Sequence, residues 1–237
     1  MSFPRLMLAV GACGCCLAGC RSTQPCSSPQ PDAQIGASEA TAPPSEYRRM
    51  LLWKAMRGLR YDSGHVEIDE PVASEIAQRG TREQALAEYE RGQELLRQNM
   101  RIQAIEAHTR AVLIAPDEAL MYEGLGTALL TKGKTPEALA AFRTALDLDP
   151  QSVVAHMGLA EALQRQRRFE EAVEELREVI RLEPDHAHAH GRLAVLLYYL
   201  EDDAGAWAQV HQTEALGSSV PPQFRELLAR RTPEPGE

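Results

Sequence analysis

The sequence repeats every 34 residues, and this period constrains the fold more than any other feature. A repeat of this length holds two helices and a turn, and two short helices alone cannot hide their apolar faces. Stability must therefore come from stacking neighbouring repeats, which predicts an all-α solenoid of helix pairs. Three ladders of residues keep the spacing: Pro116, Pro150 and Pro184; Ala104, Ala138, Ala172 and Ala206; and Gly92, Gly126, Ala160 and Ala194.

One repeat is most legible in residues 119–150, ALMYEGLGTALLTKGKTPEALAAFRTALDLDP. Its first half carries apolar residues three and four apart. After the turn KGKT we expect Thr135 to cap a second helix, with Pro136 in the first helical position. The stretch resembles the tetratricopeptide repeat, and the resemblance covers residues 85–218. The family's signature places are held by Tyr122, Leu125, Gly126, Leu129, Ala138, Phe142, Ala145 and Pro150.

Departures from the pattern mark the ends of the array. Arg91 stands where the second repeat has Leu125, His108 stands where it has Phe142, and Ser218 replaces the final proline. Terminal repeats are expected to deviate because one of their faces meets solvent. We expect repeats at 85–118, 119–152, 153–186 and, in degenerate form, 187–218, followed by a capping helix and tail at 219–237.

The resemblance implies that the first helices of the repeats line a concave groove. This surface would be unusually apolar and aromatic for one that faces water, which is typical of sites that bind a segment of another protein. The sequence therefore predicts a protein or peptide partner. The groove positions are Leu86, Tyr89 and Leu96; Leu120, Glu123 and Leu130; Val154, Met157 and Arg165; and Val195, Tyr198 and Tyr199.

The groove has an alternative occupant within the chain itself. Residues 62–80 or the capping helix would fill it if they folded back, and we expect Phe224, Leu227 and Leu228 to pack against the fourth repeat. Chaperone-binding members of the family grip a terminal carboxylate with Lys and Asn. We do not predict that ligand, because this chain has Tyr89 or Glu123, and Gln93 or Thr127, at those places.

An uncharged run, LMLAVGACGCCLAGC, precedes Arg21. It is too short to cross a bilayer, which takes about 18 residues or more, and its basic start and small-residue end are typical of a signal peptide. The last four residues, LAGC, resemble the lipobox of bacterial lipoproteins. The resemblance implies that residues 1–19 are removed and that Cys20 is acylated, which would anchor the chain in a membrane.

Residues 20–46 are rich in Ser, Thr, Gln, Pro and Ala. Such a composition cannot bury enough apolar surface to offset its ordering entropy, so we expect a disordered tether that spans on the order of 30 Å. Arg21, rather than Asp, follows Cys20. By resemblance to sorting in two-membrane bacteria, this favours the periplasmic face of the outer membrane as the location.

The tether is followed by residues 47–61, YRRMLLWKAMRGLRY, with five basic side chains and no acidic one. Apolar residues at helical spacing predict a basic amphipathic helix within the segment 47–84 that leads to the repeats. Three states stay open at this point. The helix packs on the first repeat, or it lies on anionic lipid with Trp53 at the interface, or it is disordered.

Charge and motifs exclude several function classes. Residues 62–237 carry 18 basic and 31 acidic side chains, a balance of −13 that argues against nucleic acid. No Gly-rich phosphate loop, nucleophile elbow or paired-cysteine metal site follows the tether. His186 and His190 offer at most two metal ligands, and packing is the better interpretation of His190, which replaces Tyr122. We therefore predict no enzyme, no cofactor, no metal and no small-molecule substrate.

Together these patterns predict a membrane-anchored scaffold or adaptor. It binds a protein or peptide partner through its concave groove and acts in the assembly of an envelope complex. The alternative is a structural lipoprotein that self-associates and needs no separate partner.

Overall fold

The structure of the protein is a computed structural model that describes residues 44–62, 64–69, 71, 72, 74 and 80–235. Residues Pro43–Glu237 form one compact unit, and every core residue that the structure describes lies within it. The predicted signal peptide, Cys20 and nearly all of the tether lie outside the described residues. None of the described helices is long and apolar enough to cross a membrane.

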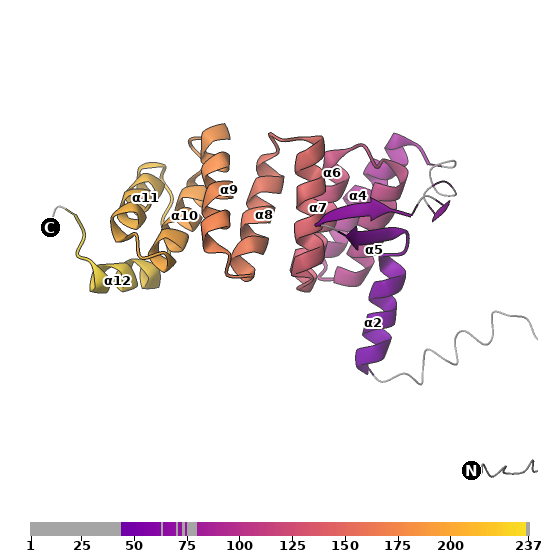
Figure 1. Cartoon of the computed structure of the whole chain (residues 1–237), viewed down its shortest axis with the longest axis horizontal. Helices are drawn as coiled ribbons and strands as arrows, with labels where there is room; N and C mark the ends of the chain where they lie inside the picture. The colour runs from indigo at the N-terminus through magenta and orange to yellow at the C-terminus, as the bar shows by residue number, and fades with distance from the viewer. Residues whose placement is uncertain (1–43, 63, 70, 73, 75–79, 236–237) are drawn as a thin grey trace, which may run out of the picture. The chain divides into compact units, whose positions relative to one another are not determined.

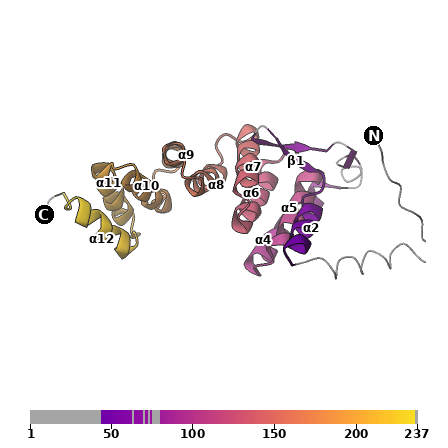
Figure 2. The same ribbon diagram turned by 60° about the horizontal axis from the view of Figure 1, so that its bottom comes forward.

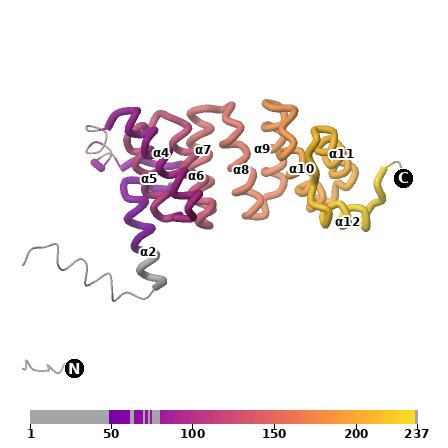
Figure 3. Tube along the Cα trace, turned by 180° about the vertical axis from the view of Figure 1, so that it is seen from behind, coloured from indigo at the N-terminus to yellow at the C-terminus, as the bar shows by residue number. Residues whose placement is uncertain are grey.

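Four helix pairs stack in chain order and form a solenoid, as the 34-residue period predicts (Figure 1). In each pair the first helix packs against the second, and each second helix packs against the first helix of the next pair. The same order is visible from behind the molecule (Figure 3). The pairs are α4 (Arg82–Arg97) with α5 (Arg101–Ile114), α6 (Ala119–Lys132) with α7 (Thr135–Leu148), α8 (Val153–Arg165) with α9 (Phe169–Leu182), and α10 (Ala187–Tyr199) with α11 (Asp203–Ala215).

Aromatic rings inserted between glycines hold the first three repeats together. Phe142 is fully buried between Gly126 of its own repeat and Gly158 of the next one. A Cβ atom added at Gly126 would lie 2.7 Å from the ring, so no larger residue fits there without displacing Phe142. The glycines therefore act by leaving room for the ring, which packs as densely as protein interiors require.

His108 fills the equivalent slot one repeat earlier. It is fully buried between Gly92 and Gly124, with the ring of Tyr89 edge-on at a centroid distance of 5.3 Å. Neither of its ring nitrogens has a hydrogen-bond partner among the described residues. Burial lowers the pKa of His108 to about 4, so the ring is neutral at neutral pH and packs as an aromatic residue. This explains how a histidine replaces phenylalanine here.

Two helix starts show where local prediction holds and where it fails. Thr81 caps α4: its hydroxyl accepts from the Gln84 N–H at 3.3 Å, and its own N–H donates to the Gln84 side chain at 3.0 Å. The prediction that Thr135 caps the second helix of the second repeat, α7, is wrong. Thr135 is itself the first residue of α7, Lys134 precedes it without a side-chain cap, and Pro136 still lies in the first turn.

A helix and a hairpin precede the repeats and pack on their second helices. Helix α2 (Pro44–Ala55) lies against α5, with Leu52 and Ala55 buried. The hairpin joins β1 (Leu59–Asp62) to β2 (His65–Ile68), and its antiparallel register pairs Leu59 with Ile68. The hairpin packs on α7, where the Val66 N–H donates to the Thr144 hydroxyl at 2.9 Å. The structure therefore has the helix packed on the first repeat, with Trp53 left exposed to solvent.

This region also corrects the predicted boundaries. The tether was predicted to reach residue 46, whereas α2 begins at Pro44; the helix predicted over 47–61 ends at Ala55. Gly58, with a φ of +97°, turns the chain out of helical geometry and into the hairpin. The all-α prediction thus missed two short strands. The described part of 62–80 includes β2, which lies on the second helices and does not fill the groove.

The last helix, α12 (Pro222–Arg231), packs against α11. Phe224 and Leu228 are buried as predicted, but Leu227 is 48% exposed, which contradicts its predicted packing. The chain beyond α12 also holds the fourth repeat, since the indole N–H of buried Trp207 donates to the Thr232 carbonyl at 3.0 Å. The helix covers the C-terminal end of the stack, as Figure 2 shows.

The buried imidazole of His108 makes stability depend on pH. Its pKa is lower in the folded chain than in the unfolded chain, where it is about 6.5. The stability it permits is therefore complete above about pH 6.5 and falls by up to about 3 kcal/mol as the pH drops toward 4. We expect His108→Phe to lose this component in urea unfolding between pH 4 and 7, measured by circular dichroism.

The variant also removes two buried polar atoms without partners, so it should be more stable than the wild type at pH 7 by about 1 kcal/mol or more. Equal pH dependence in the wild type and His108→Phe would show that the ring is not buried as the structure has it.

Candidate functional site

The first helix of each pair carries the predicted groove residues, which differ widely in exposure. Val154 and Tyr199 are each 56% exposed, and Leu86 is 36% exposed. Most of the others are half-buried, so the surface has apolar side chains that are partly open to water. The remaining positions are exposed Arg165, half-buried Tyr89, Leu96, Leu120, Met157, Val195 and Tyr198, and buried Glu123 and Leu130.

A depression of about 230 Å³ lies where α6, α8 and α10 meet. Its wall combines apolar and charged side chains, which makes it amphipathic. Four of the predicted groove residues line it, together with two charged residues from α8 and α10. These six are Leu130, Val154, Met157, Glu161, Arg165 and Arg192.

A second depression, of about 450 Å³, adjoins the first. His188 and Arg192 line both, so the two form one surface, which we call the central groove. Val195, Val220 and Pro221 give the second depression an apolar side, and Gln164 and Thr213 give it a polar one. The central groove therefore runs from α6 along α8 and α10 to the start of α12.

Three charged side chains form a network in the central groove. Glu161 lies 2.7 Å from Arg165 and 2.9 Å from Arg192. Arg192 also donates to the Gln164 side chain at 2.9 Å, and Arg165 donates to the Leu130 carbonyl at 2.7 Å. Burial alone would raise the pKa of Glu161, but the two arginines outweigh it and lower the pKa. One carboxylate thus faces two guanidiniums, and the network carries a net charge of +1.

Arg192 is the residue that the sequence reasoning missed, and the 34-residue register could have found it. Gly158 stands at the same place one repeat earlier, and Gly124 stands there two repeats earlier. These glycines let α4 approach α6, and α6 approach α8, whereas α8 and α10 come less close. At the third slot the smaller Leu176 replaces the ring, and the arginine side chain extends into the groove.

Two predicted groove residues have structural roles instead. Glu123 is buried and accepts a hydrogen bond of 2.5 Å from the Ser152 hydroxyl, so it is not open to a partner. The ring of Tyr198 lies edge-on to Phe224 of α12 at 5.7 Å and under the Arg231 guanidinium at 3.7 Å. The capping helix therefore covers the groove at Tyr198, while neighbouring Tyr199 stays exposed and stacks on Phe169.

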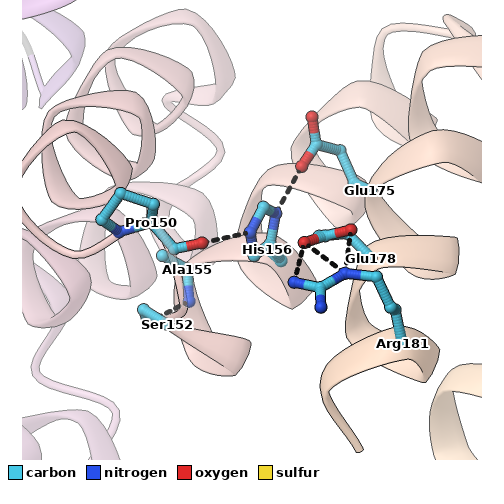
Figure 4. Close-up of polar contacts among 7 residues, drawn as sticks. All are labelled: Pro150, Ser152, Ala155, His156, Glu175, Glu178 and Arg181. Carbon is cyan, nitrogen blue, oxygen red and sulfur yellow. Dashed lines mark hydrogen bonds and ion pairs between the residues drawn. The ribbon is translucent and has the colours of Figure 1, made fainter.

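Two histidines link consecutive repeats through equivalent contacts. The Nε2–H of His156 donates to the Pro150 carbonyl at 3.2 Å, and its Nδ1 lies 2.7 Å from Glu175 (Figure 4). One repeat later His190 meets the Pro184 carbonyl at 2.9 Å and Gln209 at 2.7 Å. Each ring thus fastens the proline at a repeat's end to the second helix of the next repeat.

The two histidines considered as metal ligands from the sequence both have contacts within the chain. Both nitrogens of His190 are occupied, and His186 caps α10 by accepting from the Ala189 N–H at 3.1 Å. Among the residues that the structure describes, no cluster of three or more metal-ligating side chains occurs. The glutamates of α9 form surface ion pairs, such as Glu178 with Arg181 at 2.5 Å.

Comparisons with known proteins agree with this architecture. Two family models of the tetratricopeptide repeat match the chain, one at residues 89–153 and one at residues 129–196. Residues 89–196 are therefore similar to tetratricopeptide repeats. No curated protein sequence matches the chain.

Several solved structures share the fold. The pilF protein of Pseudomonas aeruginosa is 21% identical, with a TM-score of 0.57 over 63% of this chain and 69% of that one. MamA is 18% identical, with a TM-score of 0.55 over 62% of this chain and 82% of that one. The first repeat domain of Spaghetti (RPAP3), bound to the HSP90 peptide SRMEEVD, is 21% identical. Its TM-score is 0.50, and the match covers 52% of this chain and 97% of that one.

The contacts of His156 with Pro150 and Glu175, which we call the His156 clamp, predict a second effect of pH on stability, opposite in sign to that of His108. Burial would lower the pKa of His156, but the hydrogen bonds to Glu175 and Pro150 and the nearby carboxylates raise it. A raised pKa contributes stability that is complete below the unfolded value of about 6.5 and is lost as the pH rises through the folded value. Glu175→Gln should therefore cost about 1 kcal/mol more at pH 5.5 than at pH 8 in urea unfolding.

The equivalent site offers a matched control. Gln209→Glu places a carboxylate beside His190 and should add stability at pH 5.5 rather than remove it. If Glu175→Gln costs the same at both pH values, the ion pair does not contribute to the clamp.

Proposed function

We propose that the protein is a scaffold that binds a segment of another protein in the central groove. One observation carries the proposal. Apolar side chains in the groove are partly open to water, including Val154, Met157 and Val195. They flank two guanidiniums that share a single carboxylate as their partner. A surface of this kind is more stable when an amphipathic segment covers it than when it is exposed to water.

The chemistry of the groove indicates what the segment contains. Apolar side chains of the partner would bury Val154 and Met157, and an acidic side chain would face Arg165 and Arg192. Charge-assisted hydrogen bonds from guanidinium to carboxylate are among the strongest polar contacts in proteins. An apolar segment with at least one acidic residue therefore matches the groove in both respects.

The similar structures support this class of function. The RPAP3 domain with the same fold is described as bound to a peptide of HSP90. The tetratricopeptide repeat is typically a non-catalytic interaction fold, and we propose the same for this chain. At these identities the likeness concerns the fold, so the partner itself must come from the groove of this protein.

We further propose that acylated Cys20 anchors the protein in the bacterial cell envelope, at the periplasmic face of the outer membrane. The motif Leu17-Ala18-Gly19-Cys20 and Arg21 after it support the proposal. In that location a scaffold would serve the assembly of an envelope complex. The alternative is self-association, in which a second copy occupies the groove and sedimentation depends on concentration.

The groove is tested by a charge at its most exposed apolar position. Val154→Asp should reduce recovery of the partner about 10-fold or more in affinity capture from intact envelope, since a carboxylate would be buried against apolar surface. Leu227→Asp is the matched control, because Leu227 is similarly exposed on α12 outside the groove. Equal recovery by Val154→Asp and Leu227→Asp, with both helical by circular dichroism, would contradict groove binding.

The anchor is tested by metabolic labelling with an alkyne analogue of palmitate. We expect wild type and Cys26→Ser to incorporate the label and Cys20→Ser to lack it, because only the lipobox cysteine is modified. Label on Cys20→Ser, or none on the wild type, would refute the lipoprotein assignment. This result is independent of what the groove binds.

A further inference from the structure

A depression of about 630 Å³ lies between α2, the hairpin and the start of α7. We call it the N-terminal pocket. It is formed on the second helices of the repeats, whereas the central groove is formed on the first helices. Its lining therefore belongs to neither depression of the central groove and has no part in the proposed partner binding.

The N-terminal pocket carries an excess of positive charge. Arg60 is paired with Asp69 at 3.1 Å, and Lys134 is paired with Glu137 at 3.2 Å, so these four groups neutralise one another. Arg49 and Arg57 also line the pocket and are exposed. Neither has an ion-pair or hydrogen-bond partner among the described residues. Among the described residues that line it, the pocket thus presents two guanidiniums that no carboxylate neutralises.

Apolar surface lies directly beside this charge. Trp53 lines the pocket one helical turn after Arg49 and is 70% exposed, the largest exposure among the big apolar side chains that the structure describes. Met56 and Leu59 add apolar wall to the same pocket. An indole prefers the boundary between water and hydrocarbon, because its ring is apolar and its N–H is polar.

We propose that the N-terminal pocket binds the anionic headgroups of a phospholipid membrane, with Trp53 inserted at the interface. Arg49 and Arg57 would contact lipid phosphates, to which each basic side chain near the surface adds affinity. The apolar wall would lie against the upper acyl region, as in interfacial helices.

The charge distribution favours a membrane over other anionic partners and sets the orientation. Residues 62–237 carry a balance of −13, which would repel the dense charge of nucleic acid at any larger contact. An anionic membrane would likewise repel this acidic body and attract only the end that bears the pocket. Because the pocket is built on the second helices, the central groove on the first helices would stay open to a partner.

The test uses residues 43–237, the compact unit that holds every described core residue and lacks Cys20. Vesicles of phosphatidylcholine alone are compared with vesicles that also contain phosphatidylglycerol. Binding is measured by cosedimentation and by tryptophan fluorescence. Trp207 is only 1% exposed, so protection from soluble acrylamide and a shift of emission to the blue both report on Trp53.

We expect the protein to bind the vesicles that contain phosphatidylglycerol and not those of phosphatidylcholine alone. Binding should weaken at higher salt, and Trp53 should be protected from acrylamide. Arg49→Gln/Arg57→Gln should lower partitioning about 20-fold. Arg97→Gln/Arg230→Gln makes the same change of net charge at exposed arginines outside the pocket and should leave partitioning within about twofold, because salt screens distant charges. Circular dichroism checks that both variants keep their helices.

Three results would overturn the proposal. Equal losses in the two double variants would show that net charge, not the pocket, drives binding. Vesicle binding without protection of Trp53 would place the contact elsewhere. Protection of Trp53 by soluble glycerol phosphate, or by an acidic peptide, but not by vesicles would identify a soluble anion or a protein as the ligand. None of these results bears on the central groove.

Discussion

The structure depends on one packing arrangement, an aromatic ring held between two residues that leave it room. Phe142 lies between Gly126 and Gly158, and His108 lies between two glycines in the repeat before. Each ring contacts the first helix of its own repeat and the first helix of the next, so the same contact builds the repeat and joins it to its neighbour. Two such rings 34 residues apart join the first three helix pairs into one stack rather than a set of separate pairs.

The central groove arises where this arrangement changes. In the third slot Leu176 replaces the ring and Arg192 replaces the glycine. The long side chain cannot lie between closely packed helices, so it extends toward α8 and joins Glu161 and Gln164. In the earlier repeats the glycine at this position lets neighbouring first helices pack closely. In the last repeat the arginine at the same position keeps them apart and adds a positive charge. The binding surface is in this sense a local departure from the packing that stabilises the rest.

The period alone predicted the helix pairs, because a ladder of small residues and prolines constrains every repeat in the same way. It could not predict the hairpin at Leu59–Ile68, since four-residue strands carry little periodicity and the turn at Gly58 reads as a minor break in a basic helix. The groove residues were predicted by family position, which indicates the helix face but not burial. Glu123 lies on the expected helix yet bonds Ser152, a contact across 29 residues that no local pattern contains.

The central claim is that the surface around Val154 and Arg192 is where a partner binds. The most direct measurement places a photo-crosslinking amino acid at position 154 in the full chain, in intact cells, with position 227 as the reference site. We predict one adduct of a single discrete mass from position 154 and none from position 227. Absence of any adduct at 154, or the same adducts from both positions, would contradict the account.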